Sequence, residues 1–395
     1  MTSRPTLPPE LEPTRQAALR ALGSIRQASP ETLADHKFLF TAQRTNAGRD
    51  LPTYYLVYFL LVDLLGFQNL GQFEKVAWSV PIDFNGRTFL IEHRKMGVGV
   101  FAHDAKAEED AARQIVIHIQ RGVKAAQPFF EWLAARAVQK AFVNVVNKSD
   151  SLLDRFKFLL GAYRATAKEA LDQKEERIIE KGETPNGTWT SVHMPALQLR
   201  TEARWLALAA IDAFFSWTEH VFIHLSILTG TLTTGDEVAE LAEAEWQAKF
   251  KRALSLTDPT TKDFFDKLVV IRKELRNFVA HGAFGKQGEA FEFHSGAGAV
   301  PVLLPHLAGS RKFLLGGDFT FDDDAALEVI EKFIDHLWSG ARAPAEIYIQ
   351  QSGLPLILTM ASDGTYAQAM ASVNEMTAFV EHLTGQFDQA ANMDW

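Results

Sequence analysis

Between residues 206 and 228 the sequence carries an apolar stripe with helical spacing, and this stripe constrains the fold more than any other feature. Its members recur every three or four residues, so they share one face of a helix. They are Leu206, Ala210, Ala213, Trp217, Val221, His224 and Leu228. An acidic residue, Glu219, lies beside them. A long helix with one such face is typical of a helical bundle.

A second helix is predicted between Asp258 and Gly282. Asp258 is a favourable N-cap, Pro259 suits the first helical position, and Gly282 is a typical stop. Apolar residues recur along this segment at Phe264, Leu268, Ile271, Leu275 and Phe278. We therefore expect a helical domain over residues 196–340, interrupted by a small β insertion near 289–315.

The end of this second helix carries residues suited to chemistry, because Arg276, Asn277 and His281 share its last turns. A histidine in a last turn lies near the negative end of the helix dipole, which favours its protonated form and suits a general acid or base. Arg276 and His281 are about 140° apart around an ideal helix. For both side chains to act at one site, either the last turn of the helix is distorted or a second subunit completes the site.

The spacing of Arg276 and His281 resembles the R-x-x-x-x-H signature of the HEPN superfamily. The polar Asn277 directly after the arginine and Gly282 directly after the histidine add to the resemblance. It covers residues 196–340 and implies a short helical bundle, which usually dimerises so that the two motifs face each other. It also implies a metal-independent ribonuclease, because many members of the family have that activity.

The resemblance also implies roles for single residues. The 2′-hydroxyl of RNA would attack the adjacent phosphate, His281 would transfer protons, and Arg276 would stabilise charge on the phosphate oxygens. Asn277 would orient the histidine or the phosphate. Glu219 is a secondary candidate, because the family often carries an acidic or polar residue on the preceding helix. Arg272, one turn before Arg276, is another, since it could add to a phosphate clamp. No metal or other cofactor is needed.

The leading hypothesis is therefore an endoribonuclease that cleaves RNA as a homodimer, in the role of a toxin or antiviral-defence effector. An inhibitory or activating protein partner would control it. A different hypothesis stays open, in which the same bundle is a non-catalytic module for dimerisation or nucleotide binding within a larger defence or regulatory assembly. In that case His281 would be a capping histidine beside a solvated Arg276.

Two other histidine patterns favour structural interpretations. Arg113 and His118 have the same spacing as the first motif, but isoleucines flank His118 and indicate a half-buried face. His220 and His224 are one helical turn apart, a spacing that can chelate a metal, with Glu219 adjacent. No third ligand is evident, so we expect bundle histidines and no metal site.

A third hypothesis concerns the amino-terminal half. Asp83 and Glu92, followed by His93, Arg94 and Lys95, faintly resemble a metal-dependent nuclease of the PD-(D/E)xK kind. A hairpin turn between the two acids places them on the order of 13 Å apart, which weakens this reading. The basic cluster is better interpreted as a surface for binding RNA or a protein, or as a solvated edge.

Composition supports a folded protein without special targeting. The 395 residues are 47% hydrophobic, and the net charge of −9 does not fit indiscriminate binding of nucleic acid. The absence of cysteine excludes disulfides and thiolate chemistry. The first residues lack the apolar core of a signal peptide, and the run from Tyr54 to Phe67 is interrupted by Asp63. We expect a cytoplasmic protein that does not enter a membrane.

The chain should fold as mainly α with small β elements, in three parts. An amino-terminal α+β domain over residues 1–185 contains a β-hairpin near 76–101, with Asn85 and Gly86 in a type I′ turn, and is a candidate sensor or regulatory region. The turn-rich segment from Gly182 to Ser191 is the expected boundary. The helical bundle over 196–340 follows, and residues 341–395 form a carboxy-terminal extension.

Overall fold

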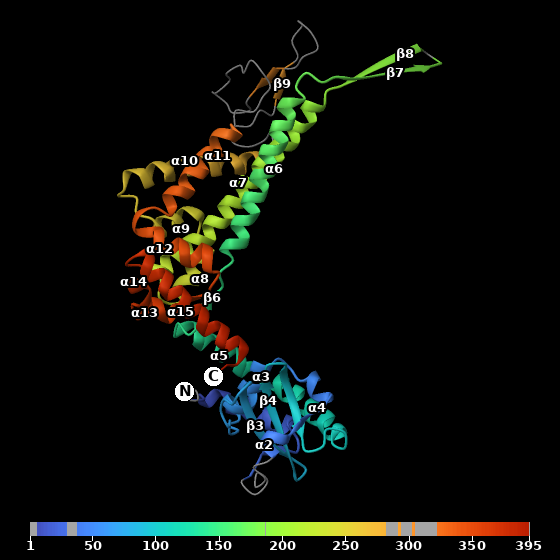
Figure 1. Ribbon diagram of the computed structural model, residues 1–395, viewed down its shortest axis with the longest axis vertical. Helices are drawn as coiled ribbons and strands as arrows, with labels where there is room; N and C mark the ends of the chain where they lie inside the picture. Colours follow the sequence, from blue (N-terminus) through green and yellow to red (C-terminus); the bar gives the residue numbers. More distant parts are fainter. Residues whose placement is uncertain are drawn as a thin grey trace. The chain divides into compact units, whose positions relative to one another are not determined.

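The computed structural model describes residues 6–29, 38–185, 187–281, 291–293, 302–304 and 322–394, and the fold is mainly α with small β elements, as predicted (Figure 1). The chain forms two compact units. The first comprises the residues up to Lys140 together with the chain from Glu381 on, and the second comprises Ala141–Val380. We describe each unit by itself.

The first unit is built on a five-stranded antiparallel sheet in the order β1-β3-β4-β5-β2. The strands are β1 (Ile25–Gln27), β2 (Gln43–Arg44), β3 (Val76–Phe84), β4 (Arg87–Arg94) and β5 (Gly97–Ala102). Asn85 and Gly86 join β3 to β4 with φ angles of 54° and 75°. Both central residues of a type I′ turn need positive φ, so the predicted hairpin is confirmed.

Helices cover the main apolar face of this sheet. They are α1 (Glu12–Ala21), α3 (Tyr54–Tyr58), which continues as the π-helical turn η3 (Phe59–Leu64), α4 (Glu109–Ala125) and α5 (Gln127–Gln139). The short helix α2 (Phe38–Thr41) lies on the other face. The larger core lies between the sheet and these helices, with Val80, Ile91 and Ile115 fully buried in it. A smaller cluster around Phe38, Leu90 and Phe101 covers the other face.

The second unit is organised by two long helices, α6 (Ser149–Asp172) and α7 (Pro195–Leu228), which pack along each other (Figure 1). Between them the chain forms an antiparallel hairpin of β7 (Ile178–Thr184) and β8 (Gly187–His193). The sequence predicts the domain boundary at residues 182–191, but these residues belong to the hairpin. The change of unit lies at Lys140 instead, because α6 packs along α7 and so belongs to the helical unit.

Shorter helices complete the helical unit. They are α8 (Gly235–Glu243), α9 (Trp246–Ala253), α10 (Pro259–His281), α11 (Asp323–Leu337), α12 (Ala343–Glu346), α13 (Leu358–Ser362) and α14 (Thr365–Ala369), while α15 (Val373–Asn392) continues into the first unit. Aromatic rings form the core between α7, α9 and α11. Phe222 contacts Trp246, Phe250 and Phe333 at ring-centre distances of 5.8, 5.2 and 6.4 Å.

The predicted β insertion is present in part. β9 (Phe291–Phe293) pairs with β10 (Val302–Leu304) in antiparallel register, while the rest of the predicted insertion, up to residue 315, lies outside the described residues. Residues 347–349, in the carboxy-terminal extension, lie in the π-helical turn η6 (Ile347–Ser352), which continues directly from α12. Leu356 and Ile357 form β11, which pairs with β6 (Asn144–Val145).

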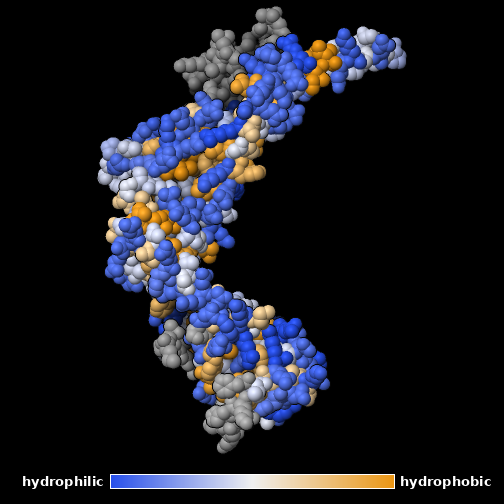
Figure 2. All heavy atoms as spheres, in the orientation of Figure 1, coloured by the Kyte–Doolittle hydropathy of each residue, from blue (hydrophilic) through white to orange (hydrophobic). Residues whose placement is uncertain are grey.

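The surface of the visible face is mostly hydrophilic, with hydrophobic residues interspersed (Figure 2). Within the described part of the chain, α7 alone has the length and apolar composition of a membrane-crossing helix. However, 56% of its most apolar 18-residue window is buried inside the protein. A core helix has this pattern, and α6 packs along α7 accordingly.

Candidate functional site

Helix α10 runs from Pro259 to His281, the bounds that the sequence predicts, so Arg276, Asn277 and His281 occupy its last two turns. Their side chains lie outside the described residues, and their convergence on one site stays a prediction. Arg272, one turn earlier on the same helix, is described in full. The site can therefore be built from Arg272 outward.

Arg272 and Glu219, the two secondary candidates, contact each other. Nη2 of Arg272 donates a hydrogen bond of 3.0 Å to Oε1 of Glu219, which lies on α7. The other oxygen of the same carboxylate accepts a bond of 2.8 Å from Nζ of Lys249 on α9. One carboxylate therefore connects α7, α9 and α10.

Aromatic rings surround this three-residue charge cluster. The guanidinium carbon of Arg272 lies 5.6 Å from the ring centre of Phe215 and 5.7 Å from that of Trp246, within range of cation–π attraction. The Lys249 side chain is only 6% exposed, whereas those of Glu219 and Arg272 keep about a third of their surface in solvent. The cluster is thus open on its Arg272 side.

The cluster has one positive charge in excess, because two cations share a single carboxylate. Among the described residues, Nη1 of Arg272 is buried and has no hydrogen-bond partner. A buried donor without an acceptor costs about 1–3 kcal/mol. The described part of α10 therefore carries excess positive charge one turn before Arg276.

Sequence reasoning did not single out Lys249, although a signal for it exists. Lys249 lies three residues after Trp246 and directly before Phe250, and both aromatic residues are buried. A lysine on the apolar face of an amphipathic helix is seldom buried unless it is paired. Its position in the pattern therefore indicates a hidden acidic partner, which is Glu219.

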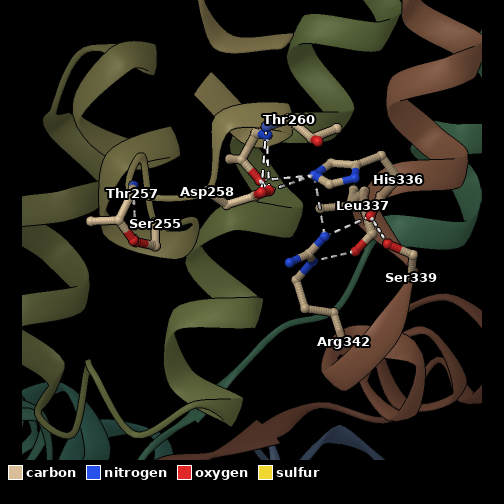
Figure 3. Close-up of polar contacts among 9 residues, drawn as sticks. Ser255, Thr257, Asp258, Thr260, His336, Leu337, Ser339 and Arg342 are labelled. Carbon is tan, nitrogen blue, oxygen red and sulfur yellow. Dashed lines mark hydrogen bonds and ion pairs between the residues drawn. The ribbon is translucent and has the colours of Figure 1, made fainter. Parts of the chain in front are cut away.

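A second polar constellation connects the start of α10 to the end of α11 (Figure 3). Oγ1 of Thr261 lies 2.6 Å from Oδ2 of Asp258 and 2.8 Å from Nε2 of His336. The carboxylate can only accept, so the hydroxyl donates to Asp258 and accepts from the imidazole N–H. Nη2 of Arg342 lies 3.4 Å from the same Nε2.

Arg342 completes this constellation at the end of α11. It donates from Nη2 to the carbonyl of His336 at 2.6 Å and from Nε to that of Leu337 at 2.8 Å. Burial lowers the pKa of His336, the nearby Arg342 charge lowers it further, and Asp258 offsets part of the shift. Because the bonds bind helix termini together and use the imidazole N–H internally, we assign the group a structural role.

The paired histidines of α7 are also held by the fold. Nε2 of His220 accepts a bond of 2.8 Å from the backbone N–H of Lys148, and the ring of His224 lies against the carbonyls of His220 and Val146 at 2.7 and 3.2 Å. The described residues contain no group of three or more His, Cys, Asp or Glu side chains that could hold a metal ion.

Arg113 and His118 lie on α4, in the first unit. Nδ1 of His118 lies 3.2 Å from the carbonyl oxygen of Ala21, and Arg113 pairs with the exposed Asp110 one turn away. The glycine opposite the imidazole, Gly23, leaves room for the ring, since a Cβ there would lie 2.5 Å from it. His118 thus acts as a packing contact between α4 and the end of α1.

The two acids of the metal-nuclease hypothesis do not meet. Asp83 accepts from the backbone N–H of Gly86 at 3.0 Å, inside the hairpin turn, and is paired with Thr88 across the strands. Glu92 lies further along β4, is 3% exposed, and bonds to Ser79 and Arg94. Each carboxylate is held by a separate structural partner, so the described geometry gives this hypothesis no support.

Comparison with known proteins returned no relatives. No protein family, no curated protein and no solved structure matches this chain.

Proposed function

We propose that this chain is a metal-independent endoribonuclease of the HEPN type that acts as a homodimer. The observation that carries the proposal is the cluster of Glu219, Lys249 and Arg272, which supplies excess positive charge one turn before Arg276 on the helix that ends at His281. Pre-positioned cations next to a general acid–base residue are what cleavage of a phosphodiester requires.

In the proposed reaction the 2′-hydroxyl of a ribose attacks the adjacent phosphorus, and the bond to the 5′-oxygen of the next nucleotide breaks. His281 removes the proton from the hydroxyl or delivers one to the leaving oxygen. Arg276 stabilises the charge that develops on the phosphate oxygens, and Asn277 orients the histidine or the phosphate. Arg272 holds the approaching RNA and takes no part in proton transfer.

The biological setting is part of the proposal. We propose a cytoplasmic toxin or antiviral effector that an inhibitory or activating protein partner controls. The net charge of −9 supports selective action, since RNA must reach a local cationic site against an overall negative field.

The decisive experiment incubates labelled total RNA and tRNA with the full chain in excess EDTA. We expect the wild type to cut, and we expect His281→Ala and Arg276→Ala to lose at least a hundredfold in rate. His382→Ala removes an exposed histidine from α15 and should cleave like the wild type. Cleavage by His281→Ala at the wild-type rate would refute the site. If neither the wild type nor any variant cleaves RNA, the result would favour the non-catalytic alternative.

Mixing two inactive variants tests how the site is shared. If Arg276 of one subunit works with His281 of the other, a heterodimer of Arg276→Ala and His281→Ala contains one intact site. The mixture should then regain activity that neither variant has alone. If both residues act within one subunit, the mixture stays inactive.

A further inference from the structure

The first unit contains a cavity of about 720 Å³ beside the start of β5. Its lining includes Arg44, Arg49, Thr53, Tyr54, Met96 and Gly97. The volume lies within the range of small-molecule sites, which is roughly 300–1,000 Å³. All of these residues belong to one unit, so the cavity is complete within it.

Arg44 is fixed in this cavity by neutral partners. Its Nη1 donates to the carbonyl of Met96 at 3.1 Å, and its Nη2 donates to that of Val98 at 2.7 Å. The side chain fits because position 99 is glycine, where a Cβ would lie 2.8 Å from Nε of Arg44. Nε itself is buried and has no hydrogen-bond partner among the described residues. The guanidinium is thus held rigidly without a counter-charge.

Positive charge accumulates around Arg44. The pKa of Arg44 is lowered by burial first, and then by the charges of Arg49 and Arg94. Arg94 is already paired with Glu92 at 2.6 Å, but within the described chain neither Arg44 nor Arg49 forms an ion pair. The fold therefore keeps two cations together at the cavity wall, and an anion placed between them would relieve their repulsion.

An aromatic ring forms another part of the wall. Tyr54 is stacked on His93, with ring centres 4.0 Å apart and planes 9° from parallel. The tyrosine remains 45% exposed and lines the cavity. Rings of this kind bind the faces of nucleobases, whatever the base.

We propose that this cavity binds a nucleoside phosphate, with the phosphate between Arg44 and Arg49 and the base against Tyr54. Arginine suits the phosphate because its planar fork donates two parallel hydrogen bonds to phosphate oxygens. The proposal concerns the first unit alone and does not depend on the proposed ribonuclease activity.

Titration calorimetry of the full chain tests this proposal, with inorganic phosphate, adenosine and the four ribonucleoside 5′-monophosphates as probes. We expect the monophosphates to bind more tightly than phosphate or adenosine alone. Arg49→Gln should weaken phosphate and monophosphate binding about ten- to a hundredfold. Tyr54→Ala should weaken the monophosphates on the order of tenfold and leave phosphate unchanged.

Arg113→Gln is the matched control, because it removes one exposed positive charge from the same unit and Arg113 does not line the cavity. It should bind every probe like the wild type. The proposal is overturned if no monophosphate binds at millimolar concentration, or if Arg49→Gln and the wild type bind equally. It is also overturned if only a single-stranded oligoribonucleotide binds, since that result would identify an RNA surface. Thermal unfolding of each variant establishes that it is folded.

Discussion

Nη2 of Arg272 lies 3.0 Å from Oε1 of Glu219, and this ion pair joins α10 to α7 one turn before Arg276. The pair has a mechanical effect as well as an electrostatic one. It joins α10 to α7 at the turn that precedes Arg276. The cluster thus links the packing of the bundle to the geometry of the proposed site.

The first prediction concerns the stability of that cluster. Glu219→Gln removes the shared carboxylate and leaves Lys249, whose side chain is 6% exposed, as a buried cation without a counter-charge. We expect a loss of about 2–3 kcal/mol in the free energy of unfolding, measured in urea. Adding Lys249→Met should recover part of that loss.

As a control, Asp263→Asn breaks an exposed pair with Lys267 on α10 and should change little. Wild-type stability in Glu219→Gln would contradict this account.

Local rules made the bounds of α10 and the β3–β4 hairpin predictable from the sequence. The adjacent residues Asp258 and Pro259 specify the start of α10. Asn85 and Gly86 specify the type I′ turn and with it the register of the hairpin, independently of the rest of the chain. The boundary between the two units, in contrast, is not specified by a local sequence rule. Gly182 and its neighbours carry turn residues, yet it is the packing of α6 against α7 that determines which unit the segment joins.

The second prediction compares two exposed glycines. Gly86 has φ of 75° and a Cβ added there would meet no atom within 4 Å, so Gly86→Ala should cost about 1 kcal/mol from backbone strain alone. Gly161 lies in the middle of α6, also with free space around it, and there alanine favours the helix. Gly161→Ala should therefore stabilise the protein by up to about 1 kcal/mol. Thermal unfolding should show shifts of opposite sign, and two shifts of the same sign would contradict the turn assignment.

The third prediction concerns pH. Burial first, and the neighbouring His224 second, lower the pKa of His220 to about 3. The unfolded chain therefore binds more protons than the folded one between about pH 6.5 and 3. The stability that the neutral ring provides is complete above pH 6.5 and falls as the pH drops, by at most about 1.4 kcal/mol per pH unit.

His220→Gln tests this prediction, because a glutamine oxygen can accept the bond from Lys148 without titrating. Urea unfolding between pH 7 and 4.5 should show a shallower loss of stability for His220→Gln than for the wild type. His193→Gln, at an exposed position in β8, serves as the control and should follow the wild type. Parallel curves for His220→Gln and the wild type would show that His220 is not the group responsible.

Part of the candidate site could not have been found from the sequence. The helix signals placed Arg272 and Arg276 one turn apart, but Lys249 is 30 residues from Glu219 and no sequence pattern pairs the two side chains. Likewise His336 is 75 residues from Thr261, and only the packing of α11 on α10 brings them together. Pairings between distant helices depend on tertiary packing, which single-sequence periodicity does not encode.

The last prediction separates the Thr261 group from the proposed catalytic site. Thr261→Val keeps the shape of the side chain but removes the hydroxyl that joins Asp258 to His336. Because Thr261 is 1% exposed, the imidazole N–H loses its acceptor where water cannot easily replace it, at a cost of about 1–3 kcal/mol. Urea unfolding measures this loss. Thr257→Val, at an exposed position before α10, is the control.

If the group is structural, folded Thr261→Val should cut RNA at the wild-type rate below its melting temperature. A fully stable Thr261→Val with impaired cleavage would instead place His336 in the chemistry.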